Sequence, residues 1–320
     1  MTPKSSIAKV TSARSARRPS RDWAAYDKAQ VNAGRLTLWL APDVFRRPRG
    51  NGRRGRNQLY SDELILGALA LRKLLRFPYR RLEGLLLGFA ELVGHTGPVP
   101  DYSTLCERAA TLHVPPLLRA AGRVDLILDS TGLRVAGPGE WRRLEGEARK
   151  RRYLKLHLAE DAATGEIVDW RLTGTRGWGA GDTTQGERML GGLADAGVAL
   201  GVVHADGAYD TGPIRRAAHA GGGRAVIPPK RSARLAGGPG RAPPQPWQRE
   251  RNQQILACRR DRAEWKEAAG YHRRSRVEAT FSRWKTLFGS SLAARTPERQ
   301  QVEAAVGVWL LNQLLVAGET

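Results

Sequence analysis

The run RVDLILDST, Arg123 to Thr131, is the part of the chain that most narrows the choice of fold. It is apolar, rich in β-forming residues, and ends in a carboxylate, Asp129. The next segment, LKLHLAEDAATGEIVDWRLTG (Leu154 to Gly174), alternates apolar and polar residues on both sides of a Thr-Gly turn, as a β-hairpin does. One strand followed by a hairpin predicts the beginning of a β-sheet.

Strands and helices alternate after this hairpin. DTTQGERMLGGLADAG predicts a helix, and VALGVVHADGAYD predicts a second apolar strand that ends in an acid, Asp206. A helix around GPIRRAAHA and a strand in RAVIPP follow. We expect closing helices at about 248–269, 273–288 and 298–316. This order predicts an α/β layer with a mixed sheet.

The chain before Pro115 is helical in pattern. Residues 63–93 show helical periodicity on both sides of Phe77-Pro78, Ser61 or Asp62 can cap the first helix, and a third helix is expected near Ser103. We therefore predict a small helical domain over residues 23–115 and a catalytic domain over 116–320. The helical domain either binds DNA in a helix-turn-helix-like way or is a structural or dimerisation bundle.

Three segments are predicted to lie outside regular structure. Residues 1–22 form a basic arm, with no acid among the first 21 residues, which we expect to be disordered. Residues 45–58 form an arginine-rich linker with glycine and proline. Residues 230–247 are rich in glycine and proline and are expected to form a long mobile loop.

The charge of the chain points to a polyanionic partner. The sequence has 53 Lys and Arg against 31 Asp and Glu, a net charge of +22. Its longest apolar runs are far shorter than the ~18 residues that a membrane span requires, so nucleic acid is the expected partner. The two cysteines match no zinc-ligand spacing and are too few for a disulfide framework, which indicates a reducing intracellular compartment.

The helix expected in GYHRRSRVEATFSRWK (Gly270 to Lys285) adds a third acid. At about 100° per residue, Tyr271, Arg274, Glu278 and Lys285 fall on one narrow stripe. This stripe lies beside an apolar one formed by Val277, Phe281, Trp284 and Phe288. An ordinary Arg/Glu pair on a solvated face is the alternative. An acid among so many arginines is better explained as a metal ligand surrounded by phosphate contacts.

Asp129, Asp206 and Glu278 form a candidate metal site. Both aspartates follow apolar strands, and the carboxyl edge of an α/β sheet is a common position for functional groups. Three converging carboxylates would repel one another unless cations neutralise them. Mg²⁺ prefers carboxylates together with phosphate oxygens, and two such ions can activate a water or a 3′-hydroxyl and stabilise the leaving oxygen. The three acids therefore indicate phosphodiester chemistry.

The spacing of Tyr271, Arg274, Glu278 and Lys285 matches the Y-(2)-R-(3)-E-(6)-K signature of bacterial insertion-sequence DDE transposases. From about Trp23 onward, including DSTGLRV, ADGAYDT and AVIPPK, the chain resembles the group named after insertion sequence five, within the superfamily named after insertion sequence four. The resemblance implies a ribonuclease-H-like catalytic domain. In it Asp129 lies on the first strand, Asp206 after the fourth, and Glu278 on a helix that follows an insertion.

The resemblance also implies a function. The protein would be a DNA transposase that binds terminal inverted repeats, cuts at their ends and joins the 3′-hydroxyls to target DNA. The three acids would be both catalytic groups and ligands of two Mg²⁺ ions, which Mn²⁺ can replace. The partners implied are double-stranded DNA and further copies of the chain in a synaptic complex, in the bacterial cytoplasm at the nucleoid. The residues expected to contact DNA are Tyr271, Arg274, Lys285, Arg53, Arg54 and Arg56.

Two other functions stay open at this point. A nuclease of the same fold would cleave DNA without joining it, and a catalytically inert regulator would only bind the ends of its own element. Among the smaller signals, His157 is expected to be structural, and His204 is either structural or a supporting neighbour of Asp206. Asp210 is expected to cap a helix.

Overall fold

The computed structural model describes residues 23–35, 40–41, 43–46, 59–115, 122–135, 153–175 and 179–319. The predicted arm at 1–22 and residues 47–58 of the predicted linker lie outside these ranges. Predictions for these two segments therefore remain untested.

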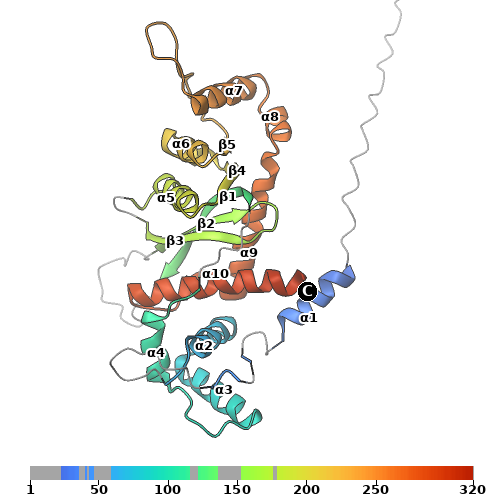
Figure 1. The fold of residues 1–320 in the computed structure, drawn as a ribbon, viewed down its shortest axis with the longest axis vertical. Coiled ribbons are helices and arrows are strands. Elements are labelled where there is room, and N and C mark those ends of the chain that lie inside the picture. The colour runs from blue at the N-terminus through green and yellow to red at the C-terminus, as the bar shows by residue number, and fades with distance from the viewer. Residues whose placement is uncertain are drawn as a thin grey trace, which may run out of the picture.

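The described chain begins with helices, continues with strands and helices in turn, and closes mainly with helices, in the predicted order (Figure 1). The first four helices are α1 (Trp23–Ala33), α2 (Asp62–Leu75), α3 (Tyr79–Leu92) and α4 (Tyr102–Thr111). The strands are β1 (Arg123–Val135), β2 (Tyr153–Asp161), β3 (Ile167–Gly174), β4 (Ala199–Ala205), β5 (Arg224–Val226) and β6 (Ser291–Leu292). The later helices are α5 (Asp182–Asp195), α6 (Gly212–Ala220), α7 (Pro246–Arg260), α8 (Arg262–Ala268), α9 (Ser275–Phe288) and α10 (Pro297–Glu319).

The sheet is mixed and confirms the predicted ribonuclease-H-like architecture. Its order is β3-β2-β1-β4-β5, and β6 pairs with the far end of β1. The three strands β1, β2 and β3 form an antiparallel meander, whereas β4 and β5 run parallel to β1. In the predicted hairpin, Leu158 of β2 lies opposite Trp170 of β3. The carboxyl ends of β1 and β4 therefore point the same way.

Alternation along the strands divides the interior into two cores. Leu126 and Leu128 of β1 face α5 and α6, where they meet Met189, Leu190 and Ile214. Ile127 and Leu133 of β1 face the opposite way, toward α9, α10 and the N-terminal helices. Because side chains of a strand alternate between faces, each face of the sheet is buried under its own set of helices.

The N-terminal helices pack directly on α9, α10 and the sheet. Ser61 accepts a hydrogen bond from the backbone of Leu64 at 3.1 Å, so the predicted cap starts α2. Residues 64–71 of α2 are buried without a break, because α3, α4 and α10 surround the helix. Their side chains belong to the same core as α9 and one face of the sheet. The predicted boundary between two domains at residues 115 and 116 stays a prediction.

The segment after β5 differs from its prediction in detail. Residues 230–245 form turns without helix or strand, and α7 begins at Pro246; whether this loop is mobile is untested. The single helix expected at 248–269 is wrong, because Asp261 leaves helical geometry and caps α8, accepting from the backbones of Ala263 and Glu264.

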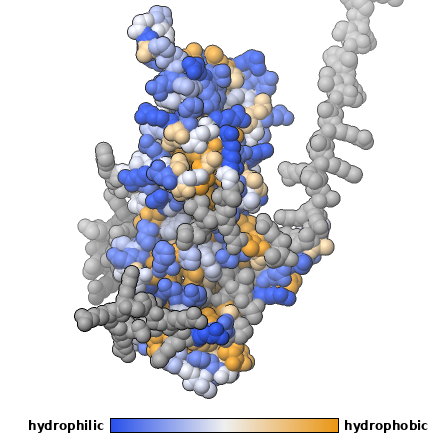
Figure 2. Space-filling view, viewed as in Figure 1, coloured by the Kyte–Doolittle hydropathy of each residue, from blue (hydrophilic) through white to orange (hydrophobic). Residues whose placement is uncertain are grey.

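The surface seen in Figure 2 is mostly hydrophilic, with scattered apolar patches. No helix in the described ranges has both the length and the apolarity to span a bilayer.

Candidate active site

Strand register brings two of the three predicted acids together. Leu128 of β1 pairs with Ala205 of β4 in a parallel ladder, so Asp129 and Asp206 follow side by side. Asp206 comes just after β4, but β1 continues to Val135, so Asp129 lies within its strand and does not end it as predicted. Asp206 begins a short 3₁₀ turn (Gly207–Tyr209), and its carboxylate accepts a hydrogen bond from the backbone of Ala208 at 2.8 Å. The carboxylate of Asp129 accepts one from the backbone of Ser130, also at 2.8 Å. Backbone donors therefore orient both carboxylates.

Helix α9 adds Glu278 through an arginine that contacts two of the acids. Arg274 Nη1 lies 2.8 Å from Glu278 Oε1, and Arg274 Nη2 lies 3.5 Å from Asp129 Oδ2. The apolar stripe predicted for this helix is buried, as Val277, Phe281, Trp284 and Phe288 all pack into the core. This packing holds the neighbouring polar stripe of α9, which carries Glu278, near Asp129.

The charges of Asp206 and Glu278 act on Asp129. Burial raises the pKa of Asp129, and the nearby charges of Asp206 and Glu278 raise it further, against the Ser130 hydrogen bond and Arg274. Burial also raises the pKa of Tyr271, and all three acids contribute to this increase. Tyr271 therefore lies within electrostatic range of all of them.

A groove runs along the exposed face of α9. It has a volume of about 500 Å³ and is lined by Thr131, Glu278, Phe281, Ser282, Lys285 and Thr286. Lys285 is exposed, and among the described residues no acid lies within ion-pair distance of it. The groove therefore has an acid near one end and a cation available for an anionic ligand.

Two family models, each described as a transposase DDE domain, match the chain over residues 31–138 and 120–313. The second covers more than half of the chain. The chain belongs to the transposase DDE domain family. Membership implies polynucleotidyl transfer in DNA transposition.

One solved structure is also similar to this DDE domain protein. It is described as a cryo-EM structure of the piggyBac transposase synaptic complex with hairpin DNA. The two chains share 12% sequence identity, with a TM-score of 0.41, and the match covers 91% of this chain and 75% of the other.

The acids of the DDE domain have suitable chemistry for a divalent metal, which DDE transposases generally use. All three are oxygen ligands of the kind preferred by Mg²⁺ and Mn²⁺. In the described part of the chain, however, no three Asp, Glu, His or Cys side chains lie close enough together to hold a metal ion. Arg274 lies between Glu278 and Asp129 instead. Asp129, Asp206 and Glu278 thus remain predicted ligands.

The predicted stripe of four polar residues is only partly correct. Tyr271 and Arg274 belong to a 3₁₀ turn (Tyr271–Arg274), and α9 begins after it at Ser275. Because a 3₁₀ turn has about 3.0 residues per turn, the helical spacing does not place Tyr271, whereas Arg274 still pairs with Glu278 four residues on. Tyr271 instead packs against Trp265 with ring centroids 6.1 Å apart. Glu278 and Lys285 do share one face, since both line the groove.

The arginines near Glu278 are mostly occupied by the protein itself. Arg276 donates to the carbonyls of Ala162, Ala163 and Thr164 in the β2–β3 turn, at 2.7 to 3.0 Å. Arg283 donates to Thr280 Oγ1 at 3.0 Å. Arg276 therefore anchors α9 to the β2–β3 turn, whereas the Arg283 contact lies within α9 itself. Arg53, Arg54 and Arg56, predicted to bind DNA, lie outside the described residues.

A polar cluster behind Asp129 was missed from the sequence. Asp182, at the start of α5, accepts hydrogen bonds from Lys155 at 2.7 Å and from Ser130 at 2.8 Å, and lies 3.4 Å from His157. His157, with Lys155 and Ser130, holds the pKa of Asp182 far below its ordinary value. An acid in the first turn of a helix is ordinarily explained by its favourable interaction with the helix dipole. The sequence therefore carried no signal for this cluster.

The two histidines lie in the sheet. His157 is fully buried, and its Nε2 lies 2.9 Å from Thr173 Oγ1 on the adjacent strand, in agreement with the predicted structural role. His204 is buried in β4 beside Ile127, and burial lowers its pKa. A supporting role of His204 for Asp206 stays a prediction.

Proposed function

We propose that this chain is the transposase of a bacterial insertion sequence in the insertion-sequence-five-like group. It binds the terminal inverted repeats of its element, cuts DNA at their ends and joins the exposed 3′-hydroxyls to target DNA. The observation that most strongly supports this proposal is the position of Arg274, which contacts both Glu278 and Asp129. A simple Arg/Glu pair on a solvated helix would not reach an acid on the first strand of the sheet.

Catalysis in this proposal depends on positioning and charge. Asp129, Asp206 and Glu278 would hold two Mg²⁺ ions, for which Mn²⁺ can substitute. When bound, the metal ions supply activation of the attacking water or 3′-hydroxyl and stabilisation of the leaving oxygen. The backbone donors at Ser130 and Ala208 keep the two aspartates oriented toward the sheet edge. No covalent protein intermediate is required.

DNA binding is assigned to the cations near the groove and in the linker. Lys285 lines the groove without an ion-pair partner in the described ranges, and Arg274 and Tyr271 lie beside the acids. Arg53, Arg54 and Arg56 are proposed to contact the DNA backbone from the linker. The net charge of +22 supports a polyanionic partner. We further propose a homo-oligomer in the synaptic complex, and a cytoplasmic location at the nucleoid.

The deciding experiment is cleavage and joining of a labelled duplex that carries the DNA end flanking the gene, with Mg²⁺ and a supercoiled target. The wild-type chain should cut at the end and join, whereas Glu278→Gln should bind the duplex and do neither. A chain that cuts without joining would be a nuclease of the same fold. A chain that binds without cutting, in Mg²⁺ and in Mn²⁺, would be a DNA-binding regulator.

A further inference from the structure

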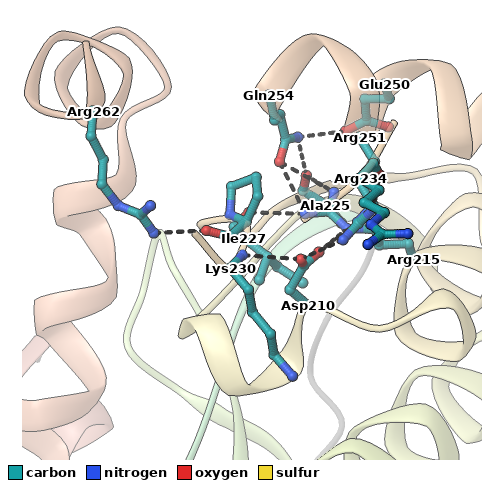
Figure 3. A network of polar contacts seen from close by, with 11 residues as sticks. Asp210, Arg215, Ala225, Ile227, Lys230, Arg234, Glu250, Arg251, Gln254 and Arg262 are labelled. Atoms are coloured by element: carbon teal, nitrogen blue, oxygen red, sulfur yellow. Dashed lines mark hydrogen bonds and ion pairs between the residues drawn. The ribbon is translucent and has the colours of Figure 1, made fainter. Parts of the chain in front are cut away.

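A second cluster of charged side chains lies four residues after Asp206, and the proposed mechanism does not use it. The carboxylate of Asp210 has no exposed surface. It accepts hydrogen bonds from Arg251 Nε and Nη2, at 2.9 and 2.8 Å, and from Arg215 Nε at 2.9 Å (Figure 3). Asp210 is the C-cap of the 3₁₀ turn Gly207–Tyr209 through its backbone N–H, in agreement with its expected role as a cap, while Thr211 occupies the N-cap position of α6.

The cluster joins three separate segments of the chain. Arg215 belongs to α6, and its Nη2 also donates to the carbonyl of Ile227, just after β5, at 2.9 Å. Both of its terminal nitrogens lie 3.2 Å from Gln254 Oε1 on α7. Gln254 in turn donates to the carbonyl of Ala225 in β5. Asp210 is thus the acceptor at the centre of contacts that come from α6, from α7 and from the end of β5 (Figure 3).

The same contacts determine where the turn that carries Asp206 can lie. The backbone of Asp210 donates to the carbonyl of Gly207, and the carboxylate of Asp210 receives the backbone N–H of Lys230 at 3.4 Å. On the other side of the turn, the buried ring of Tyr209 packs so closely on Gly186 of α5 that a Cβ there would lie 3.1 Å from it. The turn is held from both sides, and Asp206 is its first residue.

Stability alone does not account for such a cluster. A buried ion pair gains little over well-packed apolar groups of the same size, because removing both charges from water offsets their attraction. What the ionic arrangement adds is direction, since two arginines and a backbone N–H specify one position for the carboxylate. A directional restraint four residues from a predicted metal ligand is the kind of contact that orients ligands in metal sites.

We propose that Asp210, held by Arg251 and Arg215, is a positioning residue that keeps the turn at residues 206–210 in place and thereby keeps Asp206 beside Asp129. The restraint on the turn follows from the contacts alone. Its consequence for catalysis rests on the proposed function.

Arg251→Gln is the informative variant. The Arg251 side chain is 21% exposed, and Arg215 still pairs with Asp210 when Arg251 is changed, so the fold should survive. Hydrogen exchange at the amides of residues 207–211 should become about tenfold faster, while exchange in β1 and β4 stays unchanged. Arg260→Gln is the matched control, because Arg260 is 78% exposed on the same helix and pairs only weakly with Glu264, at 3.7 Å.

A second measurement connects the turn to the predicted metal ligands. With the labelled DNA end at saturation, Arg251→Gln should cleave about tenfold more slowly and need severalfold more Mg²⁺ for half-maximal rate. Mg²⁺ requires a more nearly ideal coordination geometry than Mn²⁺ does, so replacing Mg²⁺ with Mn²⁺ should recover part of the lost rate. Binding of Mn²⁺ to the DNA-free protein, followed by electron paramagnetic resonance, should weaken in parallel.

Unchanged exchange at residues 207–211 in Arg251→Gln would overturn the proposal, and so would faster exchange with unaltered metal dependence. Asp210→Asn keeps the shape of the side chain and should give the same pattern more strongly; if it does not fold, Arg251→Gln decides. If the wild-type chain cleaves no DNA end, the proposed function fails, whereas hydrogen exchange and Mn²⁺ binding still test whether the cluster positions the turn.

Discussion

Carboxyl groups near α9 differ in how far they are buried, and Glu160 is the most deeply buried of those discussed. Its side chain is fully buried in β2, beneath α9. Burial raises the pKa of Glu160 to about 7, against the opposing effects of Thr280 and Arg283. Asp129 by contrast keeps a backbone donor and an arginine. Glu160 should therefore change its charge near neutral pH.

The stability of the protein should depend on Glu160. Below about pH 4.5 the carboxyl is protonated in the folded and unfolded states alike, so burying it costs little folding stability. As the pH rises from about 4.5 to about 7, the unfolded chain releases this proton while the folded chain keeps it, so the free energy of unfolding should fall by about 3 kcal/mol. Glu160→Gln should remove this decrease, measured by urea denaturation at pH 5 and pH 8. Glu264→Gln, on an exposed residue, should keep it, and an identical pH dependence in wild type and Glu160→Gln would contradict the assignment.

Lys285 provides a test of phosphate contact at a single residue. If it neutralises one DNA phosphate, Lys285→Gln should reduce the slope of log affinity against log salt concentration by about 0.9. The measurement is fluorescence anisotropy with the DNA end at several salt concentrations. Arg188→Gln, an exposed arginine on α5 across the sheet, should leave the slope unchanged. Equal slopes for Lys285→Gln and wild type would show that the groove does not bind phosphate.

At the scale of elements, α9 and α10 pack in close contact. Trp284 of α9 is buried and meets Phe288 edge to face, with ring centroids 5.2 Å apart. Gly307 of α10 lies against this tryptophan, where an added Cβ would be 2.4 Å from the ring. The absence of a side chain at Gly307 thus allows the helix that carries Glu278 to approach the core.

Two glycine substitutions should therefore have opposite effects. Gly307→Ala should lower the free energy of unfolding by about 1–3 kcal/mol, because the tryptophan must shift in a packed core. Gly191→Ala in α5 meets nothing within 4 Å and should raise it by up to about 1 kcal/mol, through helix propensity. Thermal and urea denaturation measure both. Stabilisation by Gly307→Ala would show that α9 and α10 are more loosely packed than described.

At the scale of the whole molecule, the N-terminal helices and the sheet share one core. Lys73 of α2 forms a buried ion pair with Glu303 of α10 at 3.1 Å, and its Nζ lies 5.0 Å from the ring centroid of Trp284. Arg76 lies near the last carbonyls of α9. The helical segment thus covers the side of α9 that faces away from the groove.

This shared core predicts a single cooperative unit. The full chain should unfold in one calorimetric transition, and a fragment of residues 116–320 should fail to fold, because removal of α2 exposes the apolar sides of α9 and α10 and leaves Glu303 without its partner. A fragment that melts cooperatively by circular dichroism would instead favour two independent domains, divided as the sequence suggests.

The fold was largely predictable because its signals are local. Apolar runs located β1 and β4, alternation located β2 and β3, and the stripe of Val277, Phe281, Trp284 and Phe288 located α9. The break at Asp261 and the 3₁₀ turn at Tyr271 were missed, since a cap and a tightened turn differ from continued helix by only a few hydrogen bonds.

By itself, the sequence determined the order of strands β1 to β5 along the chain and the resemblance to DDE transposases, and it supplied the three acids as predicted ligands. These follow from residue type and periodicity, which are properties of a short stretch. Only the tertiary structure decided the partners of the charged side chains: Arg276 on a turn, Arg274 between two acids, and Asp210 in a buried cluster. A charged group can form hydrogen bonds or ion pairs with any suitable donor or acceptor nearby. Residues far apart in the chain come close to one another only when the fold has formed.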